Sequence, residues 1–89
     1  MITLEKWHEW MHLYCDANAF MPRSLKRDLS SNPDFMERFR RRFEWVLQTQ
    51  PITAQEWERR NDTSFDEDAE LHEHLQQIYD FMFRDGPHP

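Results

Sequence analysis

The sequence predicts an all-α domain, a compact bundle of roughly four to five helices without a β-sheet. Apolar residues recur at three- and four-residue spacings along most of the 89-residue chain, the period of a helix with one buried face. Helix-capping residues precede these segments, and no segment alternates as a strand does. The single glycine, Gly86, follows the last periodic segment. We therefore expect a single domain over residues 1–89, with 85–89 a short tail.

The segment 32–50 is predicted to be the central helix. Asn32 can cap its first free amides, Pro33 suits the first helical position, and Pro51 marks its end. Its apolar residues span about a third of the circumference, which is enough to face a core. They are Phe35, Met36, Phe39, Phe43, Val46 and Leu47.

Two helices are expected before this segment. The first covers residues 3–18 with Thr3 as its cap, and after a turn at 19–22 a short helix covers 24–29. The inner face of the first helix is predicted to consist of Leu4, Trp7, Met11 and Tyr14, widened by Trp10, Leu13 and Ala17. Glu5, Glu9, His12 and Asp16 are expected to face water.

Two more helices are expected after Pro51. Thr53 and Glu56 form a capping box at the start of a helix that ends near Arg60. After a polar connector, Ser64 and Glu67 offer a second capping box for a last helix over 65–84. Its inner residues are Leu71, Leu75, Ile78 and Met82.

Composition restricts the location and the kind of partner. The lone Cys15 cannot form an internal disulfide, and no signal peptide or membrane span is recognisable, so we expect a cytoplasmic protein. The net charge of −6 is unevenly spread. Residues 23–42 carry seven basic residues against three acidic ones, whereas residues 61–85 carry eight acidic residues against Arg84 alone. The chain is therefore bipolar.

The five residues from His8 to His12 read H-E-x-x-H, which resembles the zinc signature of metalloproteases. The resemblance implies that His8 and His12 bind zinc and that Glu9 activates a water. Against this, no substrate-aligning strand can precede the motif, no third ligand stands at a familiar spacing, and both imidazoles are expected on the solvated side of the helix. We expect two surface histidines with no metal, no cofactor and no enzymatic activity; a zinc peptidase is the enzyme alternative.

Two other sets of residues with reactive side chains are expected to have no catalytic or metal-binding role. His72 and His74 are two positions apart, so they point to different sides of a helix and are expected on a solvated face. Cys15 has His12 one turn away, but nothing orients that imidazole, so a small buried apolar group is expected.

The arginines at 38 and 40–42 lie near Trp45 and several Phe residues, a combination found in nucleic-acid-binding surfaces. The acidic net charge opposes binding to a polyanion. We expect these arginines to pair with the acidic last helix. A small regulator or antitoxin that binds nucleic acid through its Arg-rich helices remains an alternative.

The acidic residues around the start of the last helix predict a surface for a basic protein partner, because clustered charge speeds encounter and sets orientation. Aromatic residues outside the predicted stripes can anchor such an interface. The predicted partner-binding residues are Asp62, Phe65, Asp66, Asp68, Glu70, Glu73 and Trp45. The other interpretation of this acidic set is a solvated helix start.

In size, acidity and the expectation of exposed aromatic residues the chain resembles the small immunity proteins that bacteria pair with nuclease toxins, including those of colicin and contact-dependent growth inhibition systems. The resemblance is one of type, without a shared motif. It implies an inhibitor that covers the active or substrate-binding surface of a basic toxin. A phage or plasmid protein that mimics DNA would use the same acidic residues.

Overall fold

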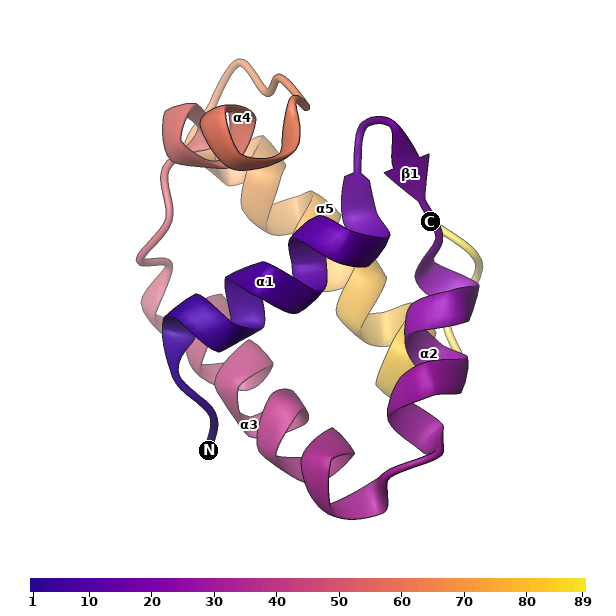
Figure 1. Cartoon of the computed structure of the whole chain (residues 1–89). Helices are drawn as coiled ribbons and strands as arrows, with labels where there is room; N and C mark the ends of the chain where they lie inside the picture. Colours follow the sequence, from indigo (N-terminus) through magenta and orange to yellow (C-terminus); the bar gives the residue numbers. More distant parts are fainter.

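The computed structural model describes all residues from 1 to 89 and contains five helices and one short strand (Figure 1). The elements are α1 (Leu4–Cys15), β1 (Ala19–Phe20), α2 (Pro22–Ser30), α3 (Pro33–Thr49), α4 (Ala54–Asn61) and α5 (Asp68–Phe83). The predicted all-α class is confirmed. None of the helices combines the length and the apolar character that a membrane crossing would require.

The predicted turn at 19–22 is a tight reversal. Isolated antiparallel bridges join Cys15 to Phe20 and Asp16 to Ala19, so β1 returns the chain along the end of α1 without forming a sheet. Helix α2 then begins earlier than predicted, at Pro22, because proline suits a first helical turn that needs no amide hydrogen.

Helices α2, α3 and α4 each pack against both α1 and α5. Figure 1 shows α1 crossing in front of the more distant α5, with α4 at one end of the molecule and the α2–α3 connection at the other. The space between these helices is filled by aromatic side chains. Trp7 makes an edge contact with Phe43 at 5.2 Å between ring centroids and lies 6.2 Å from Trp57. The core is therefore small but dense in aromatic surface.

The predicted inner faces are largely confirmed, and two residues were placed wrongly. Trp7, Phe39, Phe43 and Trp57 are fully buried, as are the inner leucines of α2 and α5. Leu13, predicted on the inner face of the first helix, is 60% exposed. Ala17 is also exposed, because α1 ends at Cys15 and this residue belongs to the reversal. The inner face of α1 therefore ends at Cys15 and does not extend to Ala17 as predicted.

Three predicted helix caps are confirmed. Thr3, Asn32 and Thr53 each accept a hydrogen bond from the amide three residues later, at 3.1, 3.2 and 3.1 Å. The second capping box is wrong. Ser64 instead donates its hydroxyl hydrogen bond to the carboxylate of Glu58, and α5 begins only at Asp68.

The last residues lie against the body of the fold. The Gly86 amide donates to the carbonyl of Asp80 at 2.9 Å, and the imidazole of His88 lies 5.3 Å from the ring of Phe81. Residues 85–89, expected to be a short tail, thus return along the end of α5 toward β1 (Figure 1).

Candidate functional site

The two charged segments of the chain share one ion pair, between Lys26 and the exposed Asp85 at 3.6 Å, and otherwise do not pair with each other. Arg40 and Arg41 bind Glu37 at 2.7 and 3.2 Å, and Arg40 also approaches Glu44 of the same helix at 3.5 Å. Arg42 donates to the carbonyl of Ile2 at 2.8 Å. The predicted pairing of this arginine run with the acidic last helix is therefore wrong. Carboxylates three and four residues away on α3 are already within reach of these guanidinium groups.

Most acidic residues of the α4–α5 connector and early α5 make no ion pair. We define the acidic surface as the exposed carboxylates that make no ion pair in this region: Asp62, Asp66, Glu67, Glu70 and Glu73. Their charges add within a short stretch and repel one another, so a basic group placed among them relieves that repulsion. This region occupies the end of the molecule that carries α4 (Figure 1).

Asp68, also predicted for partner binding, has a structural role. Its carboxylate accepts a hydrogen bond at 2.7 Å from the buried amide of Ala54, the first residue of α4. We expect Asp68→Ala to lower the free energy of unfolding by about 1–2 kcal/mol, because a charged acceptor is removed and a helix-start amide loses its partner. Urea unfolding checks this, with Asp66→Ala as the matched exposed control, which should change stability by less than about 0.5 kcal/mol. Equal effects of the two substitutions would contradict the structural role.

The two aromatic residues predicted as interface anchors are both half-buried, in different surroundings. The guanidinium carbon of Arg42 lies 4.6 Å from the centroid of the Trp45 ring. Because Arg42 also binds the carbonyl of Ile2, Trp45 belongs to the contacts that hold the N-terminal residues. Phe65 lies on the connector and packs against His74, with ring centroids 5.3 Å apart. Of the two, Phe65 is the one that the fold places beside the acidic surface.

The predicted solvated face around His72 and His74 is wrong. His72 is buried, and its Nδ1 lies 2.8 Å from the carbonyl of Asp68. His74 is half-buried between Phe65 and Phe20, whose ring lies 5.8 Å away. Burial lowers the pKa of His74, which favours the neutral imidazole. Phe20, His74 and Phe65 form what we call the aromatic row, which connects β1 to the connector across α5.

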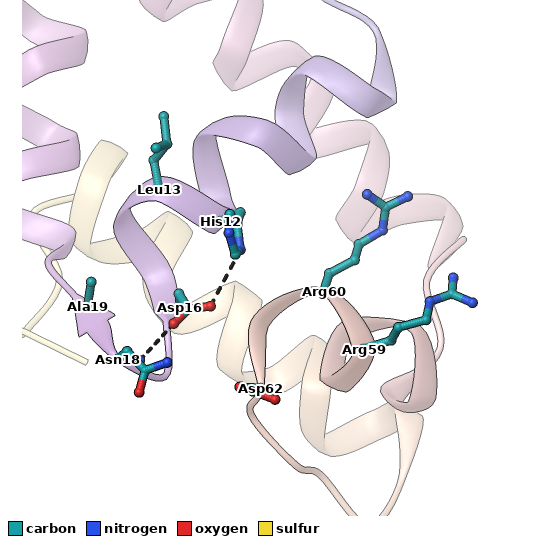
Figure 2. A pocket seen from close by; sticks show the side chains of 8 residues that line it. All are labelled: His12, Leu13, Asp16, Asn18, Ala19, Arg59, Arg60 and Asp62. Atoms are coloured by element: carbon teal, nitrogen blue, oxygen red, sulfur yellow. Dashed lines mark hydrogen bonds and ion pairs between the residues drawn. The ribbon is translucent and has the colours of Figure 1, made fainter.

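A polar hollow lies next to this region, between the end of α1 and α4. Its volume is about 490 Å³, and Figure 2 shows the eight side chains that line it. The Nδ1 atom of His12 lies 3.4 Å from the carboxylate of Asp16 and 3.3 Å from the side-chain oxygen of Asn61. Arg60 binds Glu5 at 3.2 Å. Acidic and basic side chains both line this hollow, so it carries no single sign of charge.

Of the two histidines of the H-E-x-x-H motif predicted on the solvated side, His12 is exposed as expected, whereas His8 is only 3% exposed. Both of its ring nitrogens are buried without a hydrogen-bond partner, and its ring makes an edge contact with Trp7. Burial is the main cause of the lowered pKa of His8, and the positive charge of Arg60 adds to it. No three His, Cys, Asp or Glu side chains are grouped as a metal site would require.

Cys15 behaves as the expected buried apolar group. It is 2% exposed, and burial raises the pKa of its thiol to about 12. The thiol therefore stays protonated at neutral pH, whereas a nucleophilic cysteine requires the thiolate.

Sequence reasoning missed several residues of this end of the fold. Asn61 is buried and accepts the Ala17 amide at 2.9 Å with its backbone carbonyl, which joins the ends of α1 and α4. Phe20 and Met21, treated as turn residues, are 39% and 43% exposed. Their apolar character within a predicted turn was the available indication of an exposed hydrophobic surface.

Comparison of the chain with protein-family models, with curated proteins and with solved structures finds no match.

Proposed function

We propose that this protein is a non-enzymatic, protein-binding inhibitor, an immunity protein that neutralises a basic toxin, most simply a nuclease, by covering its active or substrate-binding surface. The observation that carries the proposal is the acidic surface, whose carboxylates are exposed and have no cationic partner within the fold. The chain has arginines that could have neutralised them, yet those arginines bind elsewhere.

The expected mechanism is occlusion. A nuclease holds phosphates with basic side chains, so an acidic surface of matching extent is attracted to the same groove. Attraction over several ångströms raises the association rate about 10–10³-fold at low salt, and apolar contacts then slow dissociation. The inhibitor needs no reactive group for this activity.

Nucleic-acid binding is less well supported by the same contacts. Arg40, Arg41 and Arg42 are engaged by carboxylates or a carbonyl of the protein itself, which leaves fewer free guanidinium groups for phosphates. A DNA-mimic inhibitor would share the acidic surface but would bind many basic proteins, with strong salt dependence.

The test is a rescue experiment with a charge-reversed variant. The protein encoded directly upstream is expressed from a tight promoter, alone and together with this protein, and surviving cells are counted. We expect the neighbour to kill and the wild type to rescue. Glu70→Lys combined with Glu73→Lys should lose rescue and, with purified proteins, slow association at least about tenfold at low salt.

Glu9→Lys combined with Asp34→Lys provides a matched control, since it makes the same change in net charge. Asp34 lies in the first turn of α3, as Glu70 does in α5, and Glu9 is an exposed residue of α1 whose only ion pair is with Lys6. This control should rescue like the wild type. A harmless neighbour, or rescue by both double variants, would contradict the proposal.

A further inference from the structure

A second cavity lies beside the aromatic row, and it differs in character from the polar hollow. It measures about 360 Å³ and is lined mainly by apolar surface from Cys15, Ala17, Phe20 and His74, together with Thr63 of the connector. An apolar cavity of about 150 Å³ is large enough to hold benzene, so this one accommodates a leucine or aromatic side chain. Five segments of the chain meet there: the end of α1, the reversal, the connector, α5 and the C-terminal residue Pro89.

The surface next to this cavity is apolar and exposed. The chain exposes four large hydrophobic side chains, and three of them are close in the sequence: Leu13 lines the polar hollow, Phe20 lines this cavity, and Met21 directly follows Phe20. Their exposed fractions are 60%, 39% and 43%. Grouped exposed apolar residues beside a polar rim are typical of protein-binding surfaces.

The rim of the cavity carries negative charge. Asp16 lines the cavity, Asp62 directly precedes Thr63, and Glu70 lies one helical turn before His74. The wall residue His74 has a pKa lowered by burial, so it adds no positive charge at neutral pH. An anionic ligand would be repelled by this rim, whereas a basic segment would be attracted to it.

We propose that this cavity receives one apolar side chain, leucine or aromatic, from a basic segment of the partner protein, whose neighbouring arginine or lysine side chains bind the acidic rim. This inference rests on the proposed function and adds the anchor to it. Anchors of an interface are apolar side chains buried in a pocket and surrounded by polar contacts, which is the arrangement found here. The anchoring site is then formed by Phe20 and His74 with Phe65 beside them, and Trp45 has no part in it.

The test uses two synthetic peptides with the full 89-residue chain. One is acetyl-Arg-Arg-Leu-Arg-Arg-amide, and the other has glycine in place of leucine. In ¹⁵N–¹H NMR titrations at low salt we expect both peptides to bind. The leucine peptide should bind about tenfold more tightly, since it buries one more apolar side chain. The chemical-shift changes that the leucine peptide causes and the glycine peptide does not should fall on the amides of Ala17, Phe20, Thr63 and His74.

Ala17→Leu fills the cavity from an exposed position and leaves the core untouched. We expect it to abolish the preference for the leucine peptide while both peptides retain salt-dependent binding. Ala69→Leu, at an exposed position of α5 outside the cavity, is the matched control and should keep the preference. Glu70→Lys with Glu73→Lys should weaken both peptides together and leave the preference unchanged.

The outcomes separate this inference from the proposed function. Equal binding of the two peptides, or a preference that survives Ala17→Leu, would overturn the anchor site and leave the acidic surface in place. Failure of both peptides to bind at low salt would count against the proposed function itself. If the same cross-peaks shift when the chain is concentrated without peptide, the occupant is a second copy of the chain, and the basic-partner inference is wrong.

Discussion

Trp7→Ala is expected to lower the free energy of unfolding by about 3–5 kcal/mol, the largest effect of any single substitution considered for this protein. Trp7 is fully buried and contacts Phe43, Trp57 and His8 from the middle of α1. Its removal leaves a cavity that rigid neighbouring rings cannot fill. A domain of this length has a total stability of about 4–13 kcal/mol, so the melting temperature should fall on the order of 20 °C. Thermal and urea unfolding monitored by circular dichroism provide the measurement.

Two further variants test the cause of that loss. Trp10→Ala removes a half-buried ring from the same helix and should cost clearly less than Trp7→Ala. Trp7→Phe keeps an aromatic ring at this position and removes an indole Nε1–H that has no hydrogen-bond partner. The free energy of unfolding that it loses per unit of buried area removed should therefore be smaller than for either alanine variant. If Trp7→Ala and Trp10→Ala are equally destabilising, the central position of Trp7 in the core is contradicted.

The second large effect is a loss of stability on mild acidification, caused by His8. Burial lowers the pKa of this imidazole below the ordinary value of 6.5, and Arg60 lowers it further, whereas Glu56 and Glu5 raise it. The folded state therefore binds this proton less readily than the unfolded state. The contribution of His8 to stability is complete above the unfolded pKa and declines as the pH falls below it, until the folded pKa is reached. One such proton changes the free energy of unfolding by up to about 1.4 kcal/mol per pH unit in that window.

His74 titrates in the same direction, because burial also lowers its pKa. Urea unfolding between pH 7.5 and pH 5 should show a falling midpoint for the wild type. His8→Leu should reduce the slope, since it removes one of the two imidazoles with depressed pKa values. An unchanged slope in His8→Leu would show that His8 is not buried in its neutral form.

The helices could be predicted because their determinants are local. The side chains of Asn32 and Thr53 accept a hydrogen bond from the amide three residues later, and Pro33 fits a first helical position that needs no amide hydrogen. The apolar period of α3 places Phe39 and Phe43 on one face, whatever packs against them. The failures occurred where a distant element competes with a local pattern. The Ser64 capping box was lost because Ser64 binds Glu58, and α5 begins at Asp68, whose carboxylate binds the amide of Ala54.

The candidate site was predicted in part for the same reason. The acidic residues and Phe65 were named because their charge density and position along the chain are visible in the sequence. Phe20 and His74 were missed because their relation to Phe65 depends on three segments meeting: the reversal after α1, the connector and α5. His8 was wrongly expected in solvent. It lies at the edge of the apolar stripe of α1, so its burial depends on how α1 packs against α4.

The sequence by itself determined the all-α class, the helix starts at Leu4, Pro33 and Ala54, most of the core residues and the segregation of charge. Each of these follows from short-range hydrogen bonding, from the helical period or from the order of charges along the chain. The tertiary structure alone decided which charges remain free. The packing of the helices places no Lys or Arg within ion-pair distance of Asp62, Asp66, Glu67, Glu70 or Glu73. It also assembled the apolar cavity, since contacts among residues as far apart as Cys15, Thr63 and His74 arise only when the helices pack.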